Sequence, residues 1–243
     1  MTETLFESIF PPGVAFVCAT SVHLAPTPHG RLHPSEAALL APGCHPNRVE
    51  EFTLGRGVGR LAVSRLRGGV ESPPLLRRAD GKTPAWPPGI TGSLTHSGGW
   101  AAAAVARVED FRGVGVDLER MRPVSNGLAQ RILLPPEAAW LADHPRPDQG
   151  LMWMFSAKEA LYKALHPAGA EGLGFDVAVI TFTVEREGKA EGKDFATGSL
   201  AWRLVRQAGE GFEPGLRGEG RWSAGKGFVL TGTWLPGLID NVG

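Results

Sequence analysis

Glycine and proline interrupt this chain along its whole length, and their frequency limits the structures it can form. There are 33 glycines and 20 prolines among the 243 residues. Glycine weakens the interior of helices and strands and proline ends them, so short elements joined by many turns are expected. The two residue types follow no triplet period, which excludes collagen. Hydrophobic residues make up 42% of the chain, too large a share for a disordered tail.

The charge balance and the cysteine count exclude several classes of protein. Basic and acidic residues number 25 each, so no global positive field attracts the chain to nucleic acid or to an anionic membrane. No apolar run approaches the ~20 residues that span a bilayer, and the first ten residues, which include two glutamates and no basic residue, do not resemble a secretory signal. Cys18 and Cys44 can form neither a disulfide framework nor a Cys-x-x-Cys zinc site. A reduced, cytoplasmic protein is expected.

Hydrophobic periodicity predicts helices and strands in both parts of the chain. Apolar spacings of three and four predict a helix over 45–69 and a stronger one over 148–169, and β-branched apolar runs predict strands over 13–22 and 113–119. This mixed order favours an α+β fold with a seam near residues 108–113. The other expected elements are a short helix over 33–43, a loop over 72–92, a strand pair or strand-loop-strand over 93–107, short helices broken at Pro135 over 127–145, and antiparallel strands over 175–186, 198–207, 220–224 and 227–235.

Two carboxylates lie two residues apart on the strand predicted at 113–119. A period of two places Asp117 and Glu119 on the same face, where they repel each other unless a cation lies between them. Mg²⁺ suits such a pair, because it binds a few carboxylates and completes its shell with phosphate oxygens and water. The alternative is a solvated strand end flanked by Arg120 and Arg122.

The strongest predicted helix offers a third carboxylate. Glu159 and Lys163 are four residues apart and share one helix face. They could form a surface ion pair that contributes about 0.3–0.5 kcal/mol. Alternatively, Ser156 and Glu159 could form a capping box at a helix start, although the apolar residues before Ser156 indicate that the helix begins earlier.

A histidine among small residues suggests an anion site. His96 lies between Thr95 and Ser97 and is followed by two glycines, which allow backbone N–H groups to approach an anion. A structural histidine with satisfied hydrogen bonds is the alternative. The chain has no phosphate-binding loop of the GxxxxGK[ST] type and no GxSxG hydrolase elbow, and the glycines of GRGVGR (55–60) lack the spacing and the preceding strand of a dinucleotide fingerprint.

Taken together, these segments resemble the 4′-phosphopantetheinyl transferases, in particular the larger, monomeric, enterobactin-synthetase type. Gly-x-Asp-x-Glu followed about 40 residues later by Phe-Ser-x-Lys-Glu-x-x-x-Lys is specific in combination, and the matching pieces span most of the chain in the family's order. These pieces are RVEEFTLGR (48–56), GKTPAWPPGITGSLTHS (81–97), GVGVDLE (113–119), FSAKEALYKAL (155–165) and GRWSAGKGFVLTGTW (220–234).

The resemblance implies a fold and a reaction. Two similar α+β halves related by a pseudo-twofold are expected, with residues 1–112 binding the nucleotide of coenzyme A and residues 113–243 holding Mg²⁺, or Mn²⁺ in its place, and the catalytic groups. The family moves the 4′-phosphopantetheine arm of coenzyme A to a serine of an acyl or peptidyl carrier protein and releases adenosine 3′,5′-bisphosphate. The carrier's pathway, for example siderophore, nonribosomal peptide, polyketide or fatty-acid synthesis, stays open.

The resemblance also assigns roles to individual residues. Asp117, Glu119 and Glu159 would hold the metal ion, Glu159 would also serve as the base for the serine hydroxyl, and Lys163 would neutralise the phosphate. These three catalytic positions, Asp117, Glu159 and Lys163, would also contact coenzyme A. The other expected coenzyme A contacts are Arg48, Arg56, Gly81, Lys82, Thr83, Pro84, Thr95 and His96.

The loop before the predicted hairpin departs from the family pattern. Many relatives have Gly-Lys-Pro where this chain has Gly-Lys-Thr-Pro at 81–84. The register of the loop is therefore open by one residue, and so is whether Arg77 or Arg78 joins the phosphate site. Two rival functions share part of the pattern. A non-catalytic binder of coenzyme A or of a carrier would not need all the acids and Lys163, and a metal-dependent nucleotide phosphohydrolase would not need Arg48, Arg56 and the Thr95-His96 pair.

Overall fold

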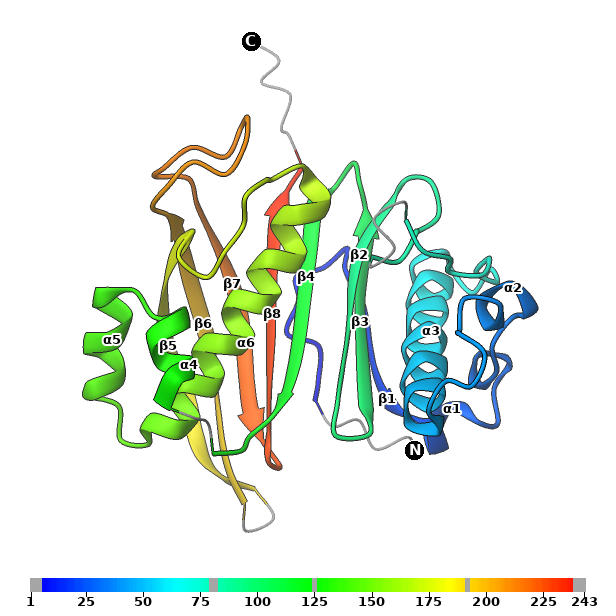
Figure 1. The fold of residues 1–243 in the computed structure, drawn as a ribbon, viewed down its shortest axis with the longest axis horizontal. Helices are drawn as coiled ribbons and strands as arrows, with labels where there is room; N and C mark the ends of the chain where they lie inside the picture. Colours follow the sequence, from blue (N-terminus) through cyan, green and yellow to red (C-terminus); the bar gives the residue numbers. More distant parts are fainter. Residues whose placement is uncertain (1–5, 79–82, 124–125, 191–192, 238–243) are drawn as a thin grey trace.

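The computed structural model describes residues 6–78, 83–123, 126–190 and 193–237, which form two β-sheets with helices packed against them (Figure 1). The strands are β1 (Ala15–Thr20), β2 (Ile90–Ser97), β3 (Trp100–Arg107), β4 (Phe111–Arg120), β5 (Ala178–Ala190), β6 (Lys193–Leu204), β7 (Arg217–Gly225) and β8 (Phe228–Pro236). The helices are α1 (Ser21–Leu24), η1 (Pro28–Gly30), α2 (Pro34–Ala37), α3 (Pro46–Leu66), α4 (Asn126–Ile132), α5 (Pro135–Ala142), α6 (Pro147–Leu165) and η2 (His166–Ala168). The described residues contain no helix of the length and hydropathy that a membrane span requires.

The two sheets share one strand order, as the expected fold requires. The first sheet has the order β1-β3-β2, and the second begins with the equivalent order β4-β8-β7 and adds β6 and β5. In both, one strand precedes the long helix, α3 or α6, and a final hairpin, β2–β3 or β7–β8, follows it. The α+β class with two similar halves is therefore confirmed.

Most of the elements predicted from the sequence are present. The helices expected over 45–69 and 148–169 are α3 and α6, and the four C-terminal strands form one antiparallel run. The region 93–107, left open between two arrangements, is the hairpin β2–β3. Its turn consists of Gly98 and Gly99, which have φ angles of 58° and 81°. Glycine adopts such left-handed conformations without the steric cost of a Cβ.

Each long helix covers one face of its own sheet (Figure 1). Val58 and Ala62 of α3 pack on the first sheet, and Ala157 and Leu161 of α6 pack on the second. A third apolar cluster lies between the sheets. It includes Ala102, Ala104, Val114, Val116, Leu118 and Leu230, from β3, β4 and β8.

Side-chain hydroxyls join β2 to β4, which lie side by side although they belong to different sheets. The Ser93 hydroxyl accepts the backbone N–H of Val116 at 3.1 Å and donates to the carbonyl oxygen of the same residue at 3.3 Å. The pattern repeats at every second residue of both strands. The further acceptor contacts are Thr95 Oγ1 with the N–H of Leu118 (3.2 Å) and Ser97 Oγ with the N–H of Arg120 (3.1 Å).

Two glycines of β4 allow α6 to approach the strand closely. A Cβ atom on Gly115 would overlap the carbonyl oxygen of Ala160, and one on Gly113 would overlap that of Ala164. The close approach also places the Ser156 hydroxyl 3.4 Å from the carbonyl oxygen of Asp117. The glycines of GVGVDLE therefore determine how near the helix can lie to the acidic end of β4.

We predict that Gly115→Ala destabilises the protein by about 3 kcal/mol or more, because the added Cβ collides with helix backbone that can move only if α6 shifts. Gly127→Ala in α4 is the matched control, since nothing lies within 4 Å of a Cβ there. The control should leave stability unchanged or raise it by up to ~1 kcal/mol. Urea unfolding curves measure both changes, and equal effects at the two positions would contradict the packing argument.

Candidate active site

Asp117 lies at the centre of a buried polar cluster at the boundary of the two halves. Its side chain is 3% exposed. Its Oδ1 accepts hydrogen bonds from Lys163 Nζ at 2.6 Å and from the Thr95 hydroxyl at 3.2 Å. Its Oδ2 is buried and has no partner in the described part of the chain. The alternative of a solvated strand end is therefore wrong for Asp117.

Glu119 lies two residues further along β4. Its Oε2 accepts a hydrogen bond from the Ser97 hydroxyl at 3.4 Å. Partial burial, and after it the negative charge of Asp117, raise the pKa of the Glu119 carboxyl to about 7. A nearby cation would strongly stabilise the charged form of a carboxyl with such a pKa.

Helix α6 brings Glu159 and Lys163 to the same cluster. Lys163 Nζ also donates to the carbonyl oxygen of Val116 at 3.3 Å, so the ammonium is held against β4. Burial raises the pKa of Glu159, the Asp117 charge adds to the rise, and the ammonium of Lys163 opposes it. Lys163 therefore pairs with Asp117 across the two elements, which a simple surface pair within the helix would not do.

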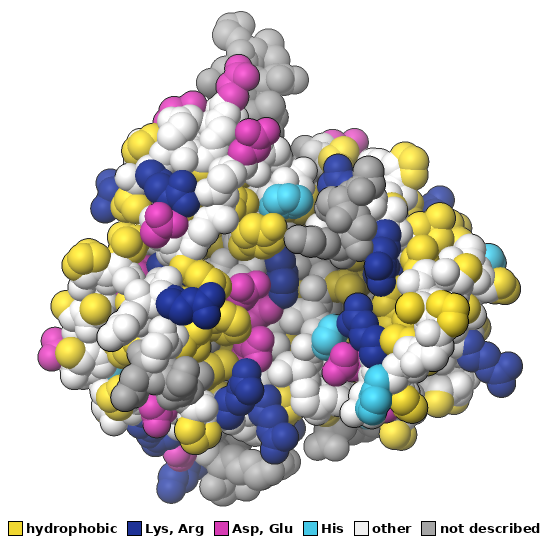
Figure 2. Space-filling model, viewed as in Figure 1, with side chains coloured by type: hydrophobic (Ala, Val, Ile, Leu, Met, Phe, Trp, Pro, Cys, Tyr) yellow, Lys and Arg dark blue, Asp and Glu magenta, His cyan; other side chains and the backbone are white. Residues whose placement is uncertain are grey.

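A cleft of about 630 Å³ extends from this cluster to the first half. α3, β2 and the segment around Pro84 form one wall, and α6 forms the other. Figure 2 shows acidic and basic side chains gathered along the hollow between the two halves. Among the residues expected to bind coenzyme A, those lining the cleft are Arg48, Arg56, Thr83, Pro84, His96, Glu159 and Lys163. Thr95 and Asp117 lie buried behind its wall.

Arg56 is a buried cation at the far end of the cleft. It is 4% exposed, and its guanidinium carbon lies 4.6 Å from the centre of the Phe52 ring. Burial lowers the pKa of Arg56, the charge of Glu36 opposes the shift, and the charges of Arg77, Arg48 and Arg60 add to it, so that the pKa is about 10. Its Nε atom has no hydrogen-bond partner among the described residues. An unpaired buried cation among other cations is suited to an anionic ligand.

His96 lies on the cleft wall between the two ends. Its Nδ1 is 3.9 Å from Glu51 Oε2. Partial burial lowers the pKa of His96, and the charges of Arg48 and Lys163 lower it as well, while Glu51 opposes the shift. A neutral imidazole at neutral pH can donate and accept hydrogen bonds without adding charge to the cleft.

The sequence assigns no role to several cleft residues, although most of them lie within the segments that resemble the family. Phe52 and Trp86 form apolar wall, and the ring of Tyr162 stacks on that of His166 with 5.4 Å between centroids. The spacing of Phe52 and Arg56, four residues apart on α3, is a signal that could have identified the first. Arg77 and Arg78 both line the cleft. Gly81 and Lys82, expected to bind coenzyme A, lie outside the described residues.

The acids do not form a complete metal site on their own. No group of three His, Cys, Asp or Glu side chains within the described ranges is arranged to hold a metal ion. What the chain does offer is the orphaned Asp117 Oδ2 beside the half-buried Glu119. This donor set fits Mg²⁺, which commonly takes one or two carboxylates and obtains its other ligands from substrate phosphates and water.

Comparison with known proteins gives consistent matches in both halves. The family model described as the 4′-phosphopantetheinyl transferase N-terminal domain matches residues 35–106, and that of the 4′-phosphopantetheinyl transferase superfamily matches residues 113–216. The holo-[acyl-carrier-protein] synthase of Thermotoga maritima has 21% identity and a TM-score of 0.36, over 52% of this chain and 64% of its own.

Full-length relatives are also similar. The 4′-phosphopantetheinyl transferase Npt of Nocardia iowensis is 36% identical over 93% of this chain and 98% of its own length. The 4′-phosphopantetheinyl transferase PptT of Mycobacterium tuberculosis is 36% identical over 94% of this chain and 96% of its own. With both halves matched and relatives covered almost end to end, the chain belongs to the 4′-phosphopantetheinyl transferase superfamily.

Proposed function

We propose that this enzyme transfers the 4′-phosphopantetheine group of coenzyme A to a serine hydroxyl of an apo carrier protein, depends on Mg²⁺, and releases adenosine 3′,5′-bisphosphate. One observation carries the proposal. A single cleft has arginines at one end and the Asp117, Lys163 and Glu159 cluster at the other. Coenzyme A carries phosphate groups that match these two ends. Its 3′-phosphate would bind at the arginine end of the cleft, and its reacting pyrophosphate would bind at the other end. We also propose that the enzyme is reduced and cytoplasmic, because Cys18 and Cys44 are both free thiols.

The basic end supports binding of the nucleotide. Arg56 has an unpaired Nε and a pKa lowered by burial, so a 3′-phosphate would relieve both the missing hydrogen bond and the charge repulsion. The positive charges of Arg48 and Arg77 lie close enough to lower the pKa of Arg56. His96 lines the cleft and is neutral at neutral pH, and it would donate a hydrogen bond to the pyrophosphate.

The acidic end supports the chemical step. The serine oxygen attacks the phosphorus atom that carries the pantetheine, that P–O bond to the adenosine bisphosphate breaks, and the serine proton must leave. Glu159 suits the acceptance of this proton, because burial raises the pKa of its carboxyl. Lys163 lines the cleft beside it and can neutralise charge that develops on the phosphate oxygens.

Asp117, Glu119 and Glu159 are the residues that would hold Mg²⁺. A bound divalent cation supplies charge stabilisation to a phosphoryl group and orients its oxygens. Because the acids alone form no three-residue metal cluster in the described chain, the cation should bind most tightly when substrate phosphates are present.

Incubation with coenzyme A, Mg²⁺ and an apo carrier protein tests the proposal by mass spectrometry. We expect the carrier to gain one phosphopantetheine and adenosine 3′,5′-bisphosphate to appear in equal amount. Nucleotide release with an unmodified carrier would favour a phosphohydrolase instead. No change in either molecule would favour a non-catalytic binder.

Asp117→Ala should lower the transfer rate by at least ~10²-fold, because the carboxylate that orients Lys163 and holds the cation is removed. Circular dichroism should show the fold retained. Transfer at the wild-type rate in a folded variant would contradict the role of Asp117.

Arg56→Ala should weaken coenzyme A binding by ~10-fold or more through loss of a charge-assisted hydrogen bond. Binding of 3′-dephospho-coenzyme A should change much less. Arg65→Ala is the matched control, since Arg65 is exposed on the same helix and bonds to the carbonyl oxygen of Phe16. Titration calorimetry measures all the affinities, and an equal loss for both ligands would show that Arg56 does not contact the 3′-phosphate.

The pKa of Glu119 predicts a pH-dependent response to Mg²⁺. The unfolded chain loses this proton near the ordinary value of 4.5 and the folded, metal-free protein near 7, so stability falls as pH rises between the two. Mg²⁺ should therefore raise the melting temperature more at pH 8 than at pH 5.5. Glu119→Gln should be more stable than wild type at pH 8 without metal, and should lose most of the pH dependence of the Mg²⁺ effect. The same Mg²⁺ response at both pH values in wild type would contradict this assignment.

A further inference from the structure

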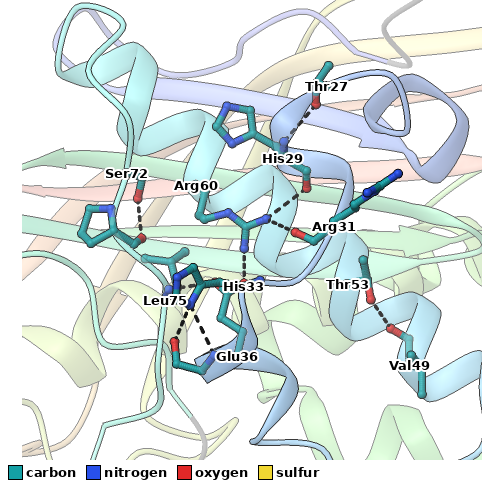
Figure 3. Close-up of polar contacts among 12 residues, drawn as sticks. Thr27, His29, Arg31, His33, Glu36, Val49, Thr53, Arg60, Ser72 and Leu75 are labelled. Carbon is teal, nitrogen blue, oxygen red and sulfur yellow. Dashed lines mark hydrogen bonds and ion pairs between the residues drawn. The ribbon is translucent and has the colours of Figure 1, made fainter.

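One buried carboxylate joins three segments of the first half (Figure 3). Glu36 is 0% exposed. Its Oε1 accepts the backbone N–H of Leu75 at 2.8 Å, and its Oε2 accepts that of His33 at 3.0 Å and forms an ion pair with Arg60. The carboxylate thus joins α2, α3 and the loop segment 72–78 to one another.

Arg60 extends the same connection. Its second terminal nitrogen donates to the carbonyl oxygens of His29, at 3.1 Å, and Arg31. Gly57, one turn earlier on α3, makes this approach possible, because a Cβ there would overlap the carbonyl oxygen of His29. The segment that precedes α2 is therefore fixed to α3 as well.

The segment held by Glu36 carries part of the nucleotide site. Arg77 follows Leu75 by two residues and lines the cleft. Its guanidinium carbon lies 5.8 Å from the centre of the Phe52 ring, and that of Arg56 lies 4.6 Å from the same centre. Two cations at one ring repel each other, so their positions must be imposed by contacts outside the pair.

The charges around Arg56 identify Glu36 as the counter-charge. Arg77, Arg48 and Arg60 act on Arg56 as like charges, and Glu36 acts as the opposite charge. Glu36 is therefore both the anion that offsets these arginines and the acceptor that fixes the segment bearing one of them.

The second half contains the same arrangement. Glu137 Oε2 accepts the N–H of Leu134 at 2.8 Å and pairs with Lys158 at 2.7 Å, and its Oε1 accepts the N–H of Ile180 at 2.9 Å. Lys158 also donates to the carbonyl oxygens of Phe175, at 2.6 Å, and Ala178. In sequence, RLHPSEAALLA (31–41) and ILLPPEAAWLA (132–142) share seven of eleven residues.

The position of each pair indicates what it serves. Lys158 precedes Glu159 on α6, so the Glu137 pair fixes the helix that carries the catalytic groups. The Glu36 pair fixes α3 and segment 72–78, which carry Arg56 and Arg77. The repeated arrangement therefore supports binding in one half and chemistry in the other.

We infer that Glu36 is a positioning residue for the nucleotide site: through Arg60 and the N–H of Leu75 it sets the spacing of Arg56 and Arg77. The inference rests on the proposed function, since it takes the arginine end of the cleft to bind the nucleotide bisphosphate of coenzyme A. Glu36 is fully buried and does not line the cleft, so it would act on the ligand only through other residues.

Two variants separate positioning from charge. Glu36→Gln removes a negative charge near the arginines, so a purely electrostatic influence would tighten the binding of adenosine 3′,5′-bisphosphate. Positioning predicts the opposite, a dissociation constant raised by ~10-fold, about one hydrogen bond. Glu36→Asp keeps the negative charge. Its side chain is one methylene shorter, so it can pair with Arg60 but cannot also reach the N–H of Leu75. It should also weaken binding several-fold, and it keeps the test valid if the glutamine variant does not fold.

Titration calorimetry with adenosine 3′,5′-bisphosphate, together with steady-state kinetics, supplies the readouts. Both Glu36 variants should raise the KM for coenzyme A and leave kcat near the wild-type value. Glu137→Gln, the matched control, should lower kcat and leave bisphosphate binding unchanged. Tighter binding by Glu36→Gln, wild-type binding by Glu36→Asp, or equal weakening by Glu137→Gln would each overturn the inference. Wild-type protein that binds neither coenzyme A nor the bisphosphate would overturn the proposed function and the inference together.

Discussion

The row of hydroxyls between β2 and β4 holds the two sheets together and orients two carboxylates of the candidate active site. A hydroxyl both accepts and donates, so Ser93, Thr95 and Ser97 accept backbone N–H groups of β4 and still have a proton to give. Thr95 gives it to Asp117 and Ser97 gives it to Glu119. The contacts that join the two halves therefore also orient two of the acids, Asp117 and Glu119, which belong to the second half.

Arginines gather at one end of the cleft, and carboxylates gather around Lys163 at the other. Burial and Asp117 raise the pKa of Glu119, while burial and neighbouring arginines lower that of Arg56. Each shift is a free-energy cost to the empty site, because the charged form is disfavoured. A phosphate-rich ligand with a divalent cation would relieve both costs at once. Under the proposed function, the affinity for coenzyme A and Mg²⁺ comes in large part from electrostatic strain already present in the fold.

The sequence predicts the elements and the acidic cluster better than it predicts the walls of the cleft. Period-two spacing identifies Asp117 and Glu119, and helical spacing identifies Glu159 and Lys163, because these patterns are local. Trp86 belongs to no such pattern, and Phe52 has only its helical spacing from Arg56, because an apolar residue that lines a cleft resembles any core residue in the sequence. The pairing of Lys163 with Asp117 rather than with Glu159 likewise depends on how closely α6 can lie against the glycines of β4.

The buried pairs of Glu36 and Glu137 allow the long helices of the two halves to be compared residue by residue. If Arg60 and Lys158 are equivalent, then Leu61 corresponds to Glu159, one residue further along each helix. Leu61 packs against the apolar cluster of its own half, whereas Glu159 lines the cleft. The buried pair of the second half thus has a counterpart in the first half, but there the position that corresponds to Glu159 is apolar. Under the proposed function, that half contributes cations and a binding wall, and the proton acceptor, Glu159, comes from α6.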